Sequence, residues 1–272
     1  MKFHHVSVSG LSLRYAASLR AHAPTMLLLS PLPQSVLAYE RVWTLLKPHR
    51  NLVALDLPGF GGSQGGRDIM DIFLQADVLQ AFIERLGLHD VHLVGPDVGT
   101  PVALAYLQKY HGAASALVGD GPAVYPAYMG LPIARMMQSA FWRRIYGLSA
   151  RLFIRAGNQA GYQRYQPSEA ELEDYERSYR GRMDGVMAWF AHYPEALPRL
   201  QKKLGKIKVP VKIFWGELDA IVLPRTAEVL HSHLPRSEVQ ILMGAGHFAY
   251  QDAATEFASM LLDWTDGGYL RV

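Results

Sequence analysis

The sequence contains no cysteine, which excludes disulfide bonds, thiol nucleophiles and zinc sites built on thiolates. It also lacks a strong excess of either charge, because 27 basic and 24 acidic residues give a net charge of only +3. Such a balance gives no reason to expect a nucleic-acid partner. No apolar run approaches the roughly 18 residues of a membrane span. The first ten residues, MKFHHVSVSG, lack the pattern of a signal peptide. We therefore expect a cytoplasmic protein with no membrane partner.

Half of the 272 residues are hydrophobic, which is enough for a sizeable core. Short apolar runs alternate with helical patterns along the first part of the chain. Strands are predicted at 3–8, 11–16, 25–30, 91–95 and 114–120 and from residue 51, and helices at 36–46, 71–86 and 99–110. Strands that alternate with helices indicate an α/β fold with a mostly parallel, doubly wound sheet.

The alternation stops at residue 121, and the pattern up to about residue 205 is helical, rich in Arg, Tyr and Met. It then resumes with strands at 209–216 and 238–243 and helices at 226–234 and 253–264. We therefore expect a core domain of residues 1–120 and 206–272. Residues 121–205 are expected to form a helical cap over the edge of the sheet at which its strands end, where open α/β sheets bind ligands.

The stretch Gly95-Pro96-Asp97-Val98-Gly99 joins a predicted buried strand to a predicted helix. This context is typical of the nucleophile elbow, G-x-S-x-G, in which a sharp turn presents the central side chain above the sheet. Aspartate stands in the place of serine here. Two further residues follow later strands, Asp219 in WGELDAIV and His247 in MGAGHFAY. The order nucleophile, acid, histidine is that of the α/β-hydrolases.

The whole chain resembles the α/β-hydrolase superfamily, and within it the epoxide hydrolase and haloalkane dehalogenase branch, whose nucleophile is aspartate. DLPGFGGS, WGELD and GAGHF are similar to that branch's core stretches. The resemblance implies that Asp97, Asp219 and His247 are catalytic. It also implies an oxyanion hole made by the backbone N–H groups of Leu32 and Val98.

An aspartate nucleophile suits displacement at an sp³ carbon. The carboxylate forms an alkyl ester, and water activated by a histidine then attacks the ester carbonyl carbon. A serine alkylated in this way would become an ether, which water does not readily cleave. Each residue also has a plainer interpretation: Asp97 as a turn residue at a helix N-terminus, His247 as a core histidine and Asp219 as a loop acid.

The sequence departs from the branch at several positions. Ser30-Pro31-Leu32-Pro33 stands where the family has His-Gly-x-Pro, and Val98 stands where dehalogenases have a halide-binding tryptophan. The cap position that carries the proton-donating Tyr-Arg pair of epoxide hydrolases reads Phe190-Ala191. Tyr193 lies one helical turn further on, and other tyrosines of residues 121–205 also remain candidates. The candidate pocket residues are Trp142, Trp189, Phe190 and Tyr193.

The sequence thus predicts a hydrolase that forms an ester on Asp97 and resembles epoxide hydrolases, acting on a bulky, apolar or aromatic small molecule. The alternatives are a non-hydrolytic acid–base enzyme such as a cyclase, lyase or isomerase, a dehalogenase, an ester or lactone hydrolase, and an inactive ligand-binding protein. No cofactor and no metal are expected. The expected oligomeric state is a monomer or a homodimer.

Overall fold

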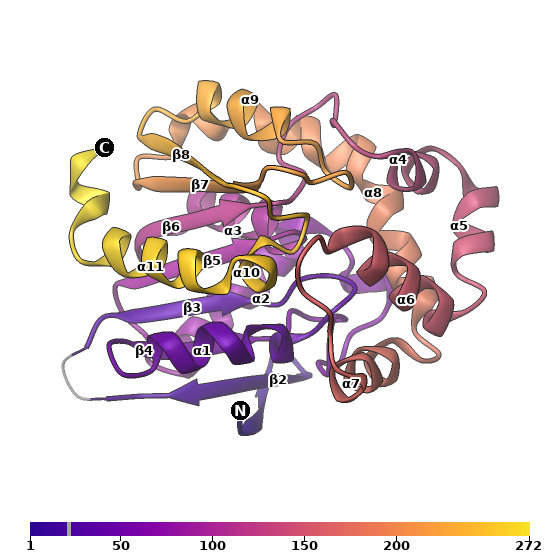
Figure 1. Cartoon of the computed structure of the whole chain (residues 1–272), viewed down its shortest axis with the longest axis horizontal. Coiled ribbons are helices and arrows are strands. Elements are labelled where there is room, and N and C mark those ends of the chain that lie inside the picture. The colour runs from indigo at the N-terminus through magenta and orange to yellow at the C-terminus, as the bar shows by residue number, and fades with distance from the viewer. Residues whose placement is uncertain (21–22) are drawn as a thin grey trace.

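The computed structural model describes residues 1–20 and 23–272, in which eight strands form one sheet (Figure 1). The strands are β1 (Phe3–Val8), β2 (Leu11–Ser18), β3 (Thr25–Leu29), β4 (Asn51–Leu55), β5 (Val91–Pro96), β6 (Ala113–Gly119), β7 (Val211–Gly216) and β8 (Ser237–Leu242). Their order is β1-β2-β4-β3-β5-β6-β7-β8. The pairs β1–β2 and β2–β4 are antiparallel and all other pairs are parallel, which confirms the predicted mostly parallel sheet.

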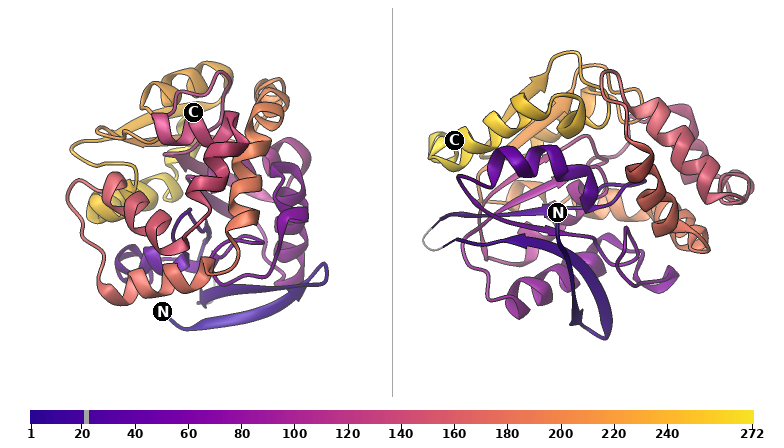
Figure 2. Two further views of the ribbon diagram at one scale, coloured as in Figure 1. Left: turned by 90° about the vertical axis from the view of Figure 1, so that its right-hand side faces the viewer. Right: turned by 60° about the horizontal axis from the view of Figure 1, so that its bottom comes forward.

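Helices cover both faces of the sheet, as expected of a doubly wound fold. One face carries α1 (Glu40–Leu46) and α11 (Ala254–Thr265), and the other carries α2 (Ile72–Arg85) and α3 (Gly99–Lys109) (Figure 2). Apart from the α-helices between β6 and β7, which are described below, the other helices are α9 (Arg225–His233), α10 (Ala249–Asp252) and the 3-10 helices η1 (Val36–Tyr39), η2 (Arg67–Ile69), η3 (Leu204–Lys206) and η4 (Gly268–Arg271).

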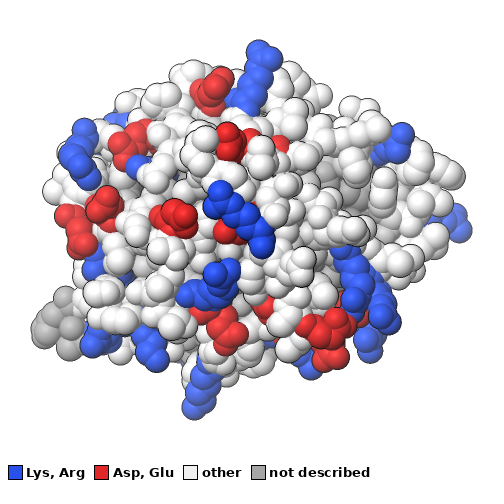
Figure 3. All heavy atoms as spheres, viewed as in Figure 1, with Lys and Arg blue, Asp and Glu red and all other residues white. Residues whose placement is uncertain are grey.

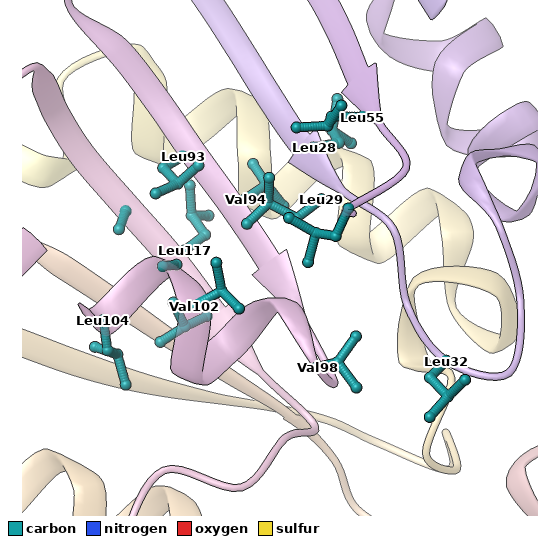
Figure 4. Packing of buried hydrophobic residues seen from close by; sticks show 14 of the residues in the cluster. Leu28, Leu29, Leu32, Leu55, Leu93, Val94, Val98, Val102, Leu104 and Leu117 are labelled. Carbon is teal, nitrogen blue, oxygen red and sulfur yellow. The ribbon is translucent and has the colours of Figure 1, made fainter. Parts of the chain in front are cut away.

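The central strands are continuous apolar runs because both of their faces are covered. Leu28 of β3 and Leu93 and Val94 of β5 are fully buried between the two helical layers (Figure 4). Helix α2 begins where the sequence predicts, because the Asp71 carboxylate accepts hydrogen bonds from the N–H groups of Phe73 and Leu74.

Residues between β6 and β7 form five α-helices that lie together beyond the ends of the parallel strands (Figures 1 and 2). They are α4 (Leu131–Gln138), α5 (Ala140–Tyr146), α6 (Ala150–Gly161), α7 (Glu169–Tyr179) and α8 (Met183–Gln201). Helix α7 begins with a capping box in which Ser168 and Glu171 each accept a hydrogen bond from the other's backbone. We refer to these helices as the α4–α8 segment.

A buried ion-pair network ties this segment to the sheet. Arg14 of β2 donates hydrogen bonds to Asp56, which follows β4, and to both carboxylate oxygens of Asp174 in α7 at 3.0 and 3.2 Å. The Ser35 hydroxyl donates to Asp174 at 2.6 Å. Burial opposes ionisation of Asp174, yet the hydrogen bonds from Arg14 and Ser35 lower the pKa of Asp174 below its ordinary value. These ion pairs and hydrogen bonds therefore hold α7 against the sheet.

We predict that Asp174→Asn lowers the free energy of unfolding by about 1–3 kcal/mol, since it removes the charge that pairs with buried Arg14. The matched control is Arg177→Gln, because Arg177 contacts the same carboxylate from the exposed side of α7. An exposed pair of this kind contributes only about 0–1 kcal/mol. Urea unfolding of both variants measures the difference, and equal effects would contradict the structural role assigned to the buried pair.

Candidate active site

The turn between β5 and α3 places Asp97 at the edge of the sheet. Asp97 has a positive φ of 49° and is 7% exposed. Its N–H donates to the carbonyl oxygen of Gly119 at 2.9 Å, and its own carbonyl accepts from the N–H of Thr100 at 3.0 Å. A Cβ at Gly95 would lie 2.5 Å from the carbonyl oxygen of Gly99, so only glycine fits there. The pentapeptide thus forms the sharp turn that the sequence predicts.

Thr100 supports this turn, and the sequence patterns did not single it out. Its hydroxyl lies 2.7 Å from the carbonyl oxygen of Gly95 and 2.8 Å from that of Gly119. It also accepts a hydrogen bond from the N–H of Gly119 at 3.0 Å. One side chain therefore fixes the end of β5, the end of β6 and the start of α3 in a single arrangement.

Asp97, His247 and Asp219 converge from three separate loops. His247 Nδ1 lies 2.9 Å from Asp219 Oδ2, and His247 Nε2 lies 3.5 Å from Asp97 Oδ1. The other oxygen of Asp219 accepts from the N–H groups of Ile221 and Val222 at 2.8 and 3.0 Å. Because Asp219 is fixed in this way, it orients the imidazole with Nε2 toward Asp97.

The two carboxylates decide the charge of His247, which is only 2% exposed. Burial by itself would lower the pKa of the imidazole. The charge of Asp219, its hydrogen bond to the ring, and Asp97 on the other side together raise the pKa of His247 well above its ordinary value of 6.5. The two neighbouring carboxylate side chains therefore favour the charged form of the imidazole.

Leu32 and Val98 lie on neighbouring loops that follow β3 and β5 (Figure 4). The N–H of Leu32 donates to Asp97 Oδ2 at 2.5 Å. The N–H of Val98 has no acceptor among the residues that the structure describes. If Asp97 formed an ester, the oxygen that Leu32 binds could be its carbonyl oxygen. Negative charge develops on that oxygen when water attacks the ester, and the N–H of Leu32 is already in place to stabilise it.

Hydrogen bonds hold the Leu32 loop, although Ser30 and Pro31 stand where the resemblance predicts histidine and glycine. Gln34 anchors it: the Tyr250 hydroxyl donates to Gln34 Oε1 at 2.6 Å, and Gln34 Nε2 donates to Gln251 at 3.0 Å and to Asn158 of α6 at 3.2 Å. The Ser30 hydroxyl accepts from the N–H of Leu57 at 3.1 Å. These contacts join the loop to both the sheet and the α4–α8 segment.

Asp120 is a third carboxylate at this site, and the sequence reasoning missed it. It directly follows β6, so its position after a buried strand was a signal that could have identified it. Its oxygens accept from the N–H groups of Gly216 at 2.9 Å and Ala249 at 3.3 Å. Complete burial, together with the nearby charge of Asp219, raises the pKa of Asp120 well above its ordinary value.

A cavity of about 660 Å³ lies between the sheet edge and the α4–α8 segment. Asp97 and His247 form part of its wall, together with Leu32, Phe190 and Tyr193. The other lining side chains are almost all apolar, and they include Met129, Ile133, Met136, Ile145, Leu148, Leu152, Phe153 and Phe248. The carboxylate and the imidazole therefore face an apolar chamber.

Two of the four predicted pocket residues do not line this cavity. Trp189 lies behind Tyr193, where its indole N–H donates to the Tyr193 hydroxyl and its ring packs edge-on against Phe60. Trp142 lies on α5 under the guanidinium of Arg135. On α8, Tyr193 lies between Trp189 and Phe190 around the helix axis; Phe190 and Tyr193 line the cavity, whereas Trp189 packs toward Phe60 in the core. The sequence shows this spacing but not which face meets the cavity.

Among the tyrosines that the sequence offers as proton donors, the cavity wall within the described chain contains Tyr146 and Tyr193. Tyr193 is buried, and its hydroxyl accepts the indole hydrogen bond of Trp189. Burial, and then the charge of Asp97, raise the pKa of Tyr193 well above 10, so that its hydroxyl keeps its proton at neutral pH.

A family model described as the alpha/beta hydrolase fold matches residues 24–254. The chain belongs to the α/β-hydrolase fold family. This confirms the predicted superfamily and fold class, and the protein is an enzyme of that family.

Relatives of this α/β-hydrolase carry several different activities. The chain is 26% identical to epoxide hydrolase 3 of Mus musculus over 92% of this chain and 73% of the relative. It is 24% identical to monoacylglycerol lipase abhd6-B of Xenopus laevis over 84% of this chain and 72% of the relative. An ancestral haloalkane dehalogenase superposes with a TM-score of 0.80 at 21% identity, covering 96% of this chain and 97% of the other. That structural likeness shows the shared fold.

The described helices of this hydrolase include none with the length and apolar character needed to cross a membrane.

We predict that His247 makes the stability of the protein depend on pH. Its folded-state pKa is raised above 6.5, so its contribution is fully present below pH 6.5 and is lost as the pH rises through the folded-state pKa. The unfolding free energy of the wild type relative to His247→Gln should therefore fall between mildly acidic and alkaline buffer. Urea unfolding of both proteins across this range measures it. A difference that stays constant, or grows with pH, would contradict the charged imidazole.

Proposed function

We propose that the protein opens epoxides on bulky apolar molecules through an alkyl ester on Asp97. One observation carries this proposal: the Asp97 carboxylate is held by the N–H of Leu32 on one oxygen, lies beside His247 with the other, and faces an apolar cavity. We also propose that residues 121–205 act as a cap domain on a core of residues 1–120 and 206–272.

In the first step, an Asp97 oxygen attacks a ring carbon of the epoxide and the C–O bond breaks toward the ring oxygen. That oxygen takes a proton from Tyr193, which faces the same cavity from α8. The indole N–H of Trp189 already binds the Tyr193 oxygen and stabilises the phenolate that remains. Trp189 is thus a positioning residue in this proposal.

Forming the ester removes the negative charge of Asp97. His247 then loses one of the two carboxylates that raise its pKa, so the imidazolium becomes more acidic. The imidazolium of His247 then gives a proton to the Tyr193 phenolate, directly or through water. His247 is now neutral and oriented by Asp219, as a general base requires.

In the second step, water gives one proton to His247 and adds to the ester carbonyl carbon, while the N–H of Leu32 stabilises the oxyanion. The tetrahedral intermediate collapses, and the leaving alkoxide takes the proton of the added hydroxyl. The products are a vicinal diol, the Asp97 carboxylate and protonated His247. The starting charges of the site are therefore restored.

Dehalogenation is less well supported by the cavity. A departing halide needs N–H donors, and within the described chain no Trp, Asn or Gln side chain lines this wall. The indole of Trp189 is already bound to Tyr193, and Val98 offers no side-chain donor. A phenol that donates a proton suits an epoxide oxygen better than a halide.

The proposal predicts a trapped intermediate. His247→Gln should accumulate an adduct on Asp97 when it is incubated with aryl and alkyl epoxides, because the ester forms but water is not activated. Intact-protein mass spectrometry detects the adduct, and Asp97→Asn is the control that must lack it. Alkyl halides, esters and lactones complete the panel. If no compound leaves an adduct and the wild type turns none of them over, the covalent mechanism is wrong. Acid–base chemistry without hydrolysis, or ligand binding alone, then replaces it.

We predict that Tyr193→Phe slows ester formation from an epoxide by about 10²–10⁴-fold, the usual contribution of a positioned acid. Single-turnover mass spectrometry in the His247→Gln background measures this step. Tyr146→Phe is the matched control, because Tyr146 also lines the cavity. If Tyr146→Phe loses the rate and Tyr193→Phe keeps it, the assignment of the proton donor is reversed.

A further inference from the structure

Large apolar side chains are exposed along α4, α5, the turn after α5 and the start of α6. Leu131 and Phe141 are 62% and 64% exposed, Leu148 and Leu152 are 74% and 71% exposed, and Ile145 is 42% exposed. We call these five residues the apolar rim. Grouped apolar side chains in contact with water mark surfaces at which a protein meets another phase or partner.

Three of the five rim residues belong to the wall of the cavity that contains Asp97 and His247. Ile145, Leu148 and Leu152 are exposed to solvent and also line that cavity. Phe141 lies one helical turn before Ile145 on the same face of α5. In Figure 1, α5 is the part of the chain farthest from the sheet. An apolar path therefore leads from the outermost surface of the molecule to the candidate nucleophile.

The stretch of chain that carries the rim has only positive charges of its own, although Asp184 of α8 lines the same surface hollow as Arg144, and Glu176 of α7 lines the same hollow as Arg151. Residues 121–168 contain no Asp, Glu or Lys and six arginines, namely Arg135, Arg143, Arg144, Arg151, Arg155 and Arg164. Figure 3 shows no acidic side chain over α4 and α5 on the face that it presents.

Two of these arginines are exposed and directly adjoin rim residues in the sequence. Arg144 is exposed and forms no ion pair within the described residues. The side chain of Arg151 is 69% exposed and forms a long ion pair with Glu176 at 3.8 Å. By contrast, Arg135 stacks on Trp142, and Arg143 donates to the carbonyl oxygens of Met136 and Met137.

We propose that the apolar rim, with Arg144 and Arg151, docks on an anionic lipid membrane. The guanidinium groups bind lipid phosphates, and the rim enters the boundary between headgroups and acyl chains. The cavity then opens toward lipid, and an apolar substrate reaches Asp97 without crossing water. Docking is independent of which bond the enzyme breaks, so it does not require the reaction proposed above.

Charge and the position of the opening favour a membrane over a second copy of the chain. A symmetric dimer through the rim would bring the same exposed arginines of two copies together, which is unfavourable. A protein partner seated on the rim would also close the cavity. The expectation of no membrane partner rested on the lack of a spanning segment, and a protein that lies on a membrane surface needs none.

Co-sedimentation with vesicles tests the proposal. The wild type should sediment with vesicles of equal parts phosphatidylcholine and phosphatidylglycerol, and much less with phosphatidylcholine alone. Arg144→Gln/Arg151→Gln should weaken the partition by about fivefold for each arginine removed. Leu131→Ser/Phe141→Ser, which changes rim residues outside the cavity wall, should weaken it by at least tenfold.

The matched controls are Leu270→Ser near the C-terminus and Arg85→Gln at the end of α2, which are exposed elsewhere on the molecule. Both should bind vesicles as the wild type does, and circular dichroism confirms that each variant is folded. The proposal is overturned if the wild type sediments with neither vesicle, or if the rim variants bind unchanged. A dimer in solution that Phe141→Ser dissociates would overturn it in favour of a second copy. No outcome depends on turnover.

Discussion

The burial of one imidazole between two carboxylates is the constraint on which this site depends. Ionised groups out of water are costly unless they are paired and hydrogen-bonded. Asp219 meets this condition through His247 and two backbone N–H groups, and Asp97 meets it through His247 and Leu32. Because these partners come from loops after β3, β5, β7 and β8, the charges are stable only when four strand ends are correctly aligned.

The parallel sheet provides that alignment. Its strands end at one edge, so short loops bring Asp97, Asp120, Asp219 and His247 together although they span 151 positions of the chain, from 97 to 247. Thr100 fixes the turn at Asp97, and Gln34 ties the Leu32 loop to α6. The site is therefore built on rigid elements, with little that depends on a free loop.

The α4–α8 segment combines a firm attachment with an unusual surface. Arg14 and Asp56 hold α7 through Asp174, while α4, α5 and α6 enclose an apolar cavity on their inner side. Their outer side exposes apolar and cationic side chains. An apolar chamber strengthens the electrostatic interactions at Asp97. Both sides of the segment follow from the same sequence of small and apolar residues broken by arginines.

The sequence by itself determined the strands, their alternation with helices along the chain, and the places of Asp97, Asp219 and His247 just after strands, because the apolar runs that mark the strands can be recognised without tertiary contacts. Tertiary structure alone decided which side chains face the cavity. It selected Phe190 and Tyr193, turned Trp189 toward the core, placed Trp142 under Arg135 and added Asp120 and Thr100. The physical reason is that helical periodicity defines two faces of a helix, whereas contacts between residues far apart in the chain decide which face meets the cavity.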